Sequence, residues 1–183
     1  MSIPANPLDW SHATTDIPSA GRSFTHVATE AECAAIASEL GLIACKRLEA
    51  SYKIRPLGKG RFRLEGPLAA EVTQACVVTL QPVDAKLSLP LDLDFCPEIA
   101  ESPAGDETNE AEVLELPEIA PIENGRMNVG EVAFETLAAG LDPFPRAQGA
   151  AFTWADPREG EAAANPFAVL HKLRRPPDGE SGV

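Results

Sequence analysis

The chain has 183 residues, of which 44% are apolar, so it can bury a core and is not a wholly disordered protein. Its net charge is −13, and no window approaches the ~18 uninterrupted apolar residues that a membrane helix needs. The first ten residues lack the basic run and apolar stretch of a signal peptide. We therefore expect a soluble, cytoplasmic protein with no membrane partner.

The N-terminal part is predicted to contain one irregular segment, one strand and one helix. Residues 1–22 are rich in proline and are expected to be irregular, with room for one short edge strand. Residues 23–27 follow as a strand. Thr29 and Glu32 form a capping-box pattern, and an apolar stripe at helical spacing behind them predicts a helix over 29–40.

A β region is predicted next. Residues 50–55 and 61–64 each alternate apolar with basic side chains, and the Pro56-Leu57-Gly58-Lys59-Gly60 turn between them predicts a hairpin. Two further strands are predicted over 71–80 and 85–95. Pro90 in the second of these indicates an edge strand or a bulge, because proline cannot donate to a sheet ladder.

The negative charge is concentrated in residues 97–125, which hold nine acidic residues and no Lys or Arg. We expect this segment to be a mobile acidic loop. Several apolar residues within it could pack or form a short strand: Val113, Leu114, Leu116, Ile119 and Ile122. The loop either keeps the protein soluble or acts as a polyanion that shields the basic hairpin or holds a basic ribosomal protein.

A second helix is predicted over 129–139, with Asn128 as its cap and Glu131 in the reciprocal position. The prolines of residues 141–146 end it. Residues 147–183 are expected to be a flexible tail with a short helix at about 166–175, which Asn165 caps. The predicted fold is α+β: a mainly antiparallel sheet or small, partly open barrel over residues 23–146, with two packed helices and this short C-terminal helix.

Residues 46–63 carry the strongest signal for a binding surface, because seven basic residues there stand against Glu49 alone. A fold does not require like charges on one face of a hairpin, whereas a phosphate backbone favours them. The alternative is a solvated outer face whose charge the acidic segment balances. The RNA-binding candidates are Lys46, Arg47, Lys53, Arg55, Lys59, Arg61 and Arg63.

The C-terminal segment is the second candidate surface. It either docks on the domain as a helix or presents a linear motif to a partner, with basic residues following its apolar ones. The partner-binding candidates are Asn165, Pro166, Phe167, Leu170 and Lys172.

Catalytic and metal chemistry find little support in the sequence. The three histidines are far apart, and no phosphate-cradling glycine loop occurs. No two of the four cysteines have the two-residue spacing of a zinc ribbon, so we expect buried free thiols. We predict no catalytic residues, no metal site and no cofactor.

Three blocks resemble the YceD family of proteins for large-ribosomal-RNA-subunit accumulation, in its alphaproteobacterial form. The first is residues 74–83, QACVVTLQPV. The second is residues 128–132, NVGEV, with Glu135 and Leu137, leading into residues 142–146, DPFPR. The third is residues 165–170, NPFAVL, followed by Lys172 and Leu173. Some relatives have a second cysteine where Thr79 stands, and others have a cysteine-rich C-terminal region. This chain has neither, so it lacks the ligands that a zinc role elsewhere in the family would use.

The resemblance implies a non-enzymatic ribosome-biogenesis factor that supports 23S rRNA accumulation and assembly of the large subunit. It would contact the 23S rRNA or its precursor, a large-subunit ribosomal protein, or both, and no DNA. The alternative is a protein-protein adaptor that acts through the acidic loop and the C-terminal segment without touching RNA.

Overall fold

The structure is a computed structural model that describes residues 7–97 and 118–152. The chain divides into two compact units, Met1–Ala150 and Ala151–Val183. The helices and strands of the described residues all belong to the first unit. None of these helices is long and apolar enough to cross a membrane. The predicted C-terminal helix lies outside the described residues.

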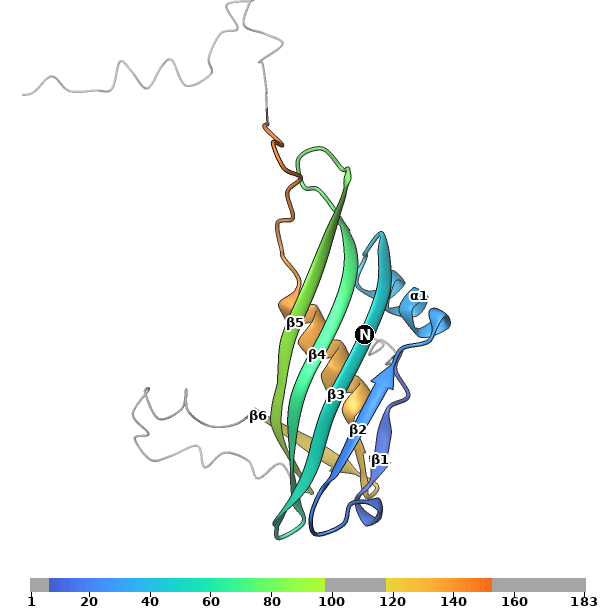
Figure 1. Cartoon of the computed structure of the whole chain (residues 1–183), viewed down its shortest axis with the longest axis vertical. Coiled ribbons are helices and arrows are strands. Elements are labelled where there is room, and N and C mark those ends of the chain that lie inside the picture. The colour runs from blue at the N-terminus through green and yellow to red at the C-terminus, as the bar shows by residue number, and fades with distance from the viewer. Residues whose placement is uncertain (1–6, 98–117, 153–183) are drawn as a thin grey trace, which may run out of the picture. The chain divides into compact units, whose positions relative to one another are not determined.

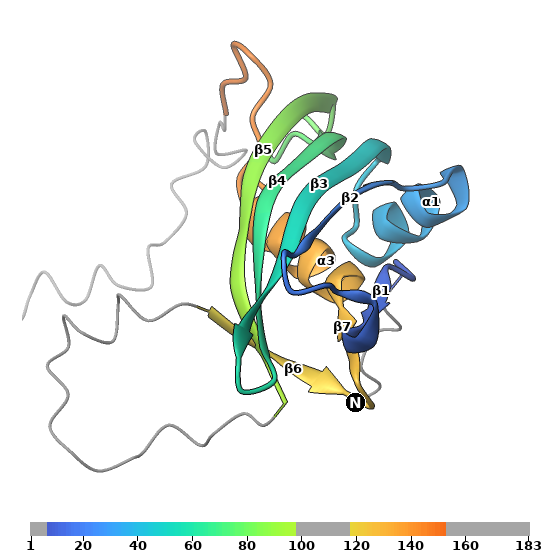
Figure 2. The same ribbon diagram turned by 60° about the horizontal axis from the view of Figure 1, so that its bottom comes forward.

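The first unit is built on one seven-stranded sheet, in the strand order β1-β7-β6-β5-β4-β3-β2, which curls into a half-barrel (Figure 1). Helix α3 lies along the concave side of the sheet, and α1 stands beside β2 and β3 (Figure 2). The elements are β1 (Ser11–Ala13), the 3-10 helix η1 (Thr14–Asp16), β2 (Arg22–Val27), α1 (Glu30–Glu39), β3 (Ala44–Gly58), β4 (Arg61–Ala75), β5 (Pro82–Cys96), β6 (Glu118–Glu123), β7 (Arg126–Asn128) and α3 (Val129–Gly140).

The predicted α+β class and partly open barrel are confirmed, but the sheet is mixed rather than antiparallel throughout. Strands β5 and β6 run parallel, with Leu93 opposite Glu118 and Cys96 opposite Pro121. A parallel pair needs a crossover connection instead of a tight turn, and residues 97–117 provide that length of chain. The short strand that Ile119 and Ile122 allowed is β6; residues 98–117 of the predicted acidic loop lie outside the described residues.

Strands β3 and β4 form the predicted hairpin, and both are longer than the sequence pattern indicated. They pair from Ala44 opposite Thr73 to Gly58 opposite Arg61. The two turn residues, Lys59 and Gly60, have φ values of 53° and 76°. Positive φ at both central positions is the pattern of a type I′ turn, whose twist fits that of the two strands, and glycine adopts a positive φ without strain.

The predicted strands over 61–64 and 71–80 are one strand, β4, that ends earlier, at Ala75. A proline inside a strand normally interrupts its ladder, but Pro67 faces Pro90 of β5. Neither proline therefore deprives the other strand of this pair of a donor. Pro67 turns its nitrogen towards β3 instead, where the ladder skips the positions between Ala50–Leu68 and Lys53–Glu65, yet β4 continues to Ala75. The prediction was also wrong beyond Ala75, where residues 77–79 form a turn closed by a hydrogen bond from Leu80 N to Cys76 O, 2.9 Å.

Both predicted helices are present with their predicted caps. The Thr29 hydroxyl accepts from Glu32 N at 3.2 Å, and the Glu32 carboxylate accepts from Thr29 N at 2.7 Å, which completes the capping box of α1. At α3 the Asn128 side chain accepts from Glu131 N at 3.3 Å. The caps fix where each helix begins and therefore which face it turns to the sheet.

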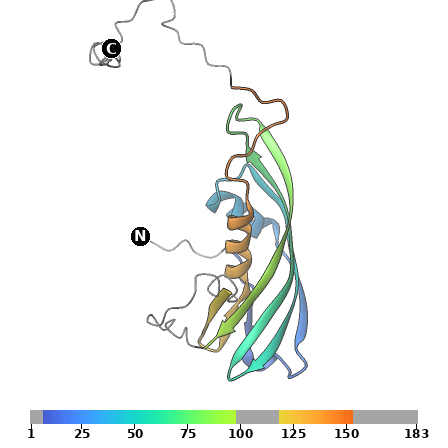
Figure 3. The same ribbon diagram turned by 90° about the vertical axis from the view of Figure 1, so that its left-hand side faces the viewer.

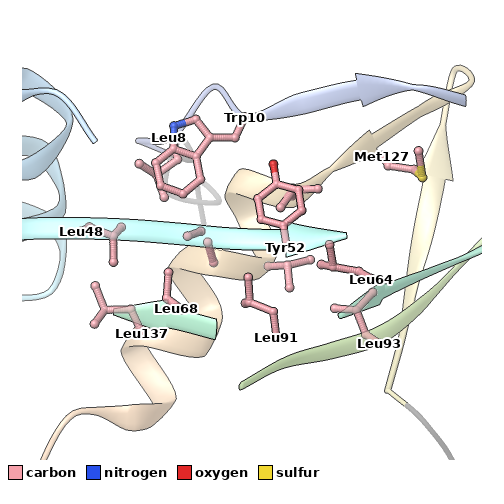
Figure 4. Close-up of a cluster of buried hydrophobic side chains, with 14 of the residues drawn as sticks. Leu8, Trp10, Leu48, Tyr52, Leu64, Leu68, Leu91, Leu93, Met127 and Leu137 are labelled. Atoms are coloured by element: carbon pink, nitrogen blue, oxygen red, sulfur yellow. The ribbon is translucent and has the colours of Figure 1, made fainter. Parts of the chain in front are cut away.

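The core lies between the concave face of the sheet and α3 (Figure 4). Alternate residues of β3, β4 and β5 point inward, so the predicted strand faces hold, and Tyr52 and Phe62 lie on the buried side. On α3, Leu137 is fully buried against them. Residues that are completely or almost completely buried include Leu48, Ile54, Leu64, Leu68, Leu91 and Phe95.

Residues 7–22, expected to be irregular, contribute to this core through Leu8, Trp10 and Ile17. Strands β1 and β2 stand at the two ends of the strand order, and aromatic rings close the distance between them. The His12 ring stacks on Phe24 with centroids 3.9 Å apart. Its Nε2 and the Tyr52 hydroxyl form a hydrogen bond of 2.8 Å. Burial raises the pKa of Tyr52, so its hydroxyl stays protonated.

This ring cluster predicts an acid-sensitive fold. Burial, reinforced by His26, Arg126 and Arg22, lowers the pKa of His12 from 6.5 to about 4. Protonation then favours the unfolded chain, so stability is constant above about pH 6.5 and falls as the pH drops from 6.5 towards 4. We expect the wild type to lose about 1–2 kcal/mol more than His12→Gln over this range, a figure reduced because the ring is half-buried.

The measurement is urea denaturation of both proteins at pH 7.0, 5.5 and 4.5. The glutamine side chain can still hydrogen-bond to Tyr52 but cannot be protonated. The difference between His12→Gln and the wild type therefore reports on protonation of His12. Parallel loss of stability in both proteins would contradict the role of His12.

Candidate partner-binding surfaces

The basic residues predicted to bind RNA lie along β3, β4 and the turn between them, as the sequence indicated. Arg55 faces Arg63 directly across the two strands. The structure places carboxylates among them, however, and most of the cations are paired. The ion pairs at 4 Å or less are Lys46–Asp84, Arg47–Glu49, Arg55–Glu65, Arg61–Asp94, and Arg63 with Glu65, Asp92 and Asp94.

Asp94 of β5 is the centre of the tightest of these clusters. It is 4% exposed and accepts hydrogen bonds from Arg61 at 2.7 Å and from Arg63 at 3.0 Å. The hydrogen bond with Asp94 raises the pKa of Arg63 further, so the guanidinium stays charged. The Asp94 pairs are part of the sheet's structure, since opposite charges across strands stabilise it.

The hairpin face therefore carries far less unpaired positive charge than its sequence suggests. Among the described residues, Lys53 and Lys59 are the members of the predicted set that make no ion pair. A phosphate backbone would have to displace carboxylates from the other five. In the part of the chain that the structure describes, the neutralising carboxylates come from β3, β4 and β5. Residues 98–117 of the acidic segment and all of the candidates in 165–172 lie outside the described residues.

Two of the three blocks that resemble YceD proteins meet at one end of the sheet. Val77 N donates to Pro145 O at 2.9 Å, and Gln74 Nε2 donates to Asp142 O at 2.9 Å. Ala147 N reaches the sulfur of Cys76 at 3.3 Å. Segments about 70 residues apart in sequence thus form one loop cluster, which we call the joined loops (residues 74–81 and 142–147).

Cys76 organises the joined loops from their centre. Its side chain is fully buried, and its sulfur accepts from the amides of Val78, Thr79 and Ala147 at 3.3–3.4 Å. These donors favour the thiolate and lower the pKa of Cys76 from 9.0 to about 6. Within residues 7–97 and 118–152, no group of three or more metal-ligating side chains gathers at this sulfur or elsewhere. All four cysteines are free and buried, as predicted.

Large apolar side chains project from the joined loops into solvent. Val77 is 47% exposed, Leu80 76% and Phe144 70%. Leu80 also has a φ of 60°, a left-handed conformation that is rare for a non-glycine residue and marks a constrained loop. The sequence did not predict that these side chains are exposed, because an apolar run such as Val77-Val78-Thr79-Leu80 also predicts a buried strand.

A groove opens on the concave side between β5, β6 and α3, with a volume of about 520 Å³. Its apolar walls include Leu89, Leu93 and Val132. Three carboxylates line it, those of Glu118, Glu131 and Glu135, and no basic side chain does. Burial and the charges of Glu131 and Glu118 raise the pKa of Glu135.

No protein-family model, curated protein or solved structure matches this chain. The resemblance to YceD proteins therefore rests on the sequence blocks themselves.

The ion-paired cluster at Asp94 makes a stability prediction. Arg63→Ala removes one of two partners of a buried carboxylate, and we expect a loss of about 2 kcal/mol in the free energy of unfolding. Arg55→Ala breaks an exposed pair in the same hairpin and should change it by less than about 0.5 kcal/mol. Urea denaturation at pH 7 measures both, and equal effects would contradict a structural role for the Asp94 cluster.

Proposed function

We propose that this protein is a cytoplasmic, non-enzymatic ribosome-biogenesis factor of the YceD type, which supports 23S rRNA accumulation and assembly of the large ribosomal subunit. The observation that carries the proposal is the contact between two of the blocks that resemble the family. Residues 74–83 and 142–146 are distant in sequence, yet they hydrogen-bond to each other through Val77 and Pro145. Two blocks that build one surface would both be needed for that surface to form, which is a physical reason for both to be present in one chain.

The joined loops are the surface through which we propose that the factor works. Val77, Leu80 and Phe144 expose apolar area on two loops that hydrogen bonds to the Cys76 sulfur connect. Exposed apolar side chains clustered at one site favour a protein partner, because burying them provides binding free energy without a charged ligand. The partner we propose is a large-subunit ribosomal protein.

Direct contact with pre-rRNA through the hairpin is the weaker route. Five of its seven basic residues are already paired with carboxylates, so few counterions would be released when a phosphate backbone binds. The effect on 23S rRNA then follows from delivering or holding a protein during assembly. A protein-protein adaptor with no part in ribosome assembly is the alternative function.

Gene replacement in the protein's own cells tests the proposal. Deleting the gene should lower the ratio of 23S to 16S rRNA and accumulate large-subunit precursors in sucrose gradients. Leu80→Ser with Phe144→Ser should reproduce the deletion without lowering the protein's melting temperature, because both side chains are exposed. Leu57→Ser, which changes an exposed leucine of the hairpin, is the matched control and should behave as wild type.

The outcomes test the role in ribosome biogenesis and the role of the joined loops separately. An unchanged 23S to 16S ratio in the deletion strain would contradict the role in ribosome biogenesis. A lowered ratio in the deletion strain together with a normal one in the double variant would leave the role standing and remove the joined loops as its surface.

A further inference from the structure

The open edge of β5 is a feature that the role in ribosome assembly does not use. Strand β5 pairs with β4 along residues 82–95, but on its other side it pairs with β6 only at residues 93–96. Figure 3 shows this edge facing the viewer, with β6 beside its lower end and α3 on the concave side. Between Pro82 and Asp92, no strand of the described residues covers it.

The facing prolines determine which backbone groups this edge presents. Pro67 and Pro90 both lack an N–H, so they can only form a non-hydrogen-bonded pair of an antiparallel ladder. The register from Ala75–Pro82 to Phe62–Phe95 has no shift. Every second residue of β5 from Pro90 therefore turns its backbone polar groups away from β4. The amides of Asp84, Lys86 and Ser88 consequently point to the open edge.

The length of this edge fits a short extended peptide. Pro82 and Pro90 bound the three available amides, and prolines at a strand edge limit pairing with other sheets. An added strand would lie directly beside the groove, because Leu89 and Pro90 belong both to the edge and to the groove wall. Side chains on its concave side would enter the groove towards α3. This arrangement is that of peptide recognition by strand addition.

Charge decides between the candidate occupants. Glu118, Glu131 and Glu135 line the groove without a cation among its lining residues. Burial, with the charges of Glu131 and Glu118, raises the pKa of Glu135. A second copy of this chain would bring two acidic grooves together. Residues 98–117 of the chain itself hold seven acids and no Lys or Arg, so they too are repelled. A basic peptide is complementary.

We infer that the edge of β5 and the acidic groove beside it bind an extended, lysine- or arginine-rich segment of another protein, which adds to the sheet as a strand. Its backbone pairs with Asp84–Ser88, its apolar side chains contact Leu89 and Val132, and its cations meet Glu131 and Glu135. This site is separate from the joined loops, and the inference does not depend on the role in ribosome biogenesis.

The experiment uses the full-length protein and a ten-residue peptide of alternating lysine and valine, with binding measured by fluorescence anisotropy at 50 and 300 mM salt. Ser88→Pro removes one outward amide and no ladder hydrogen bond, so it should keep the wild-type melting temperature and weaken binding at least about tenfold. The same peptide methylated on alternate backbone nitrogens should fail to bind. Glu131→Gln with Glu135→Gln should weaken binding to a similar extent.

A matched charge control keeps the result interpretable. Glu30→Gln with Glu39→Gln changes the net charge equally on α1, where both side chains are exposed and far along the chain from the groove, and it should leave affinity almost unchanged. Binding that survives both Ser88→Pro and backbone methylation would overturn the inference, because it would be electrostatic attraction alone. Absence of binding, or a dimer by sedimentation that Ser88→Pro abolishes, would also overturn it.

Discussion

Pro67 and Pro90 face each other across β4 and β5, and much of the structure depends on that pairing. Because both prolines lack an N–H, they occupy a non-hydrogen-bonded pair, in which neither residue directs a backbone donor or acceptor at the other strand. Two 15-residue strands therefore run unbroken and curl around α3. The same pairing fixes which amides of β5 turn outward, and so it makes the open edge a regular one.

Charge in this protein is balanced across strands more than along the sequence. The stretch from Lys46 to Arg63 is strongly basic when read in order, but β4 and β5 bring Glu65, Asp92 and Asp94 against it. On the opposite side of the sheet, the groove gathers three carboxylates and no cation. The electrostatic surface available to partners is thus more acidic than the hairpin sequence indicates, which favours basic or apolar protein partners.

Local sequence signals predicted the elements that depend on local chemistry. The capping box at Thr29, the Asn128 cap and the alternation through Tyr52 and Ile54 each act within a few residues, and each appears as predicted. Signals that depend on pairing were misleading. The sequence could not show that Pro67 meets a second proline or that β6 enters parallel to β5, since both depend on register.

The candidate site was predictable only in part for the same reason. The hairpin and its basic residues were located correctly, whereas their partners on β5 come from more than 30 residues away. Likewise, residues 74–83 and 142–146 were singled out as blocks, but their contact and the exposure of Leu80 and Phe144 follow from the tertiary fold. An apolar run looks the same in sequence whether it is buried or presented to a partner.

The most direct test of whether this is an assembly factor that works through protein contact is crosslinking in the protein's own cells. The protein is then purified, the recovered RNA is sequenced, and the crosslinked peptides are identified by mass spectrometry. The predicted result is recovery of large-subunit precursors containing 23S rRNA, with protein crosslinks at residues 76–80 and 142–147. Purification free of 23S rRNA would contradict the role in assembly, and RNA crosslinks confined to residues 46–63 would contradict the protein-mediated route.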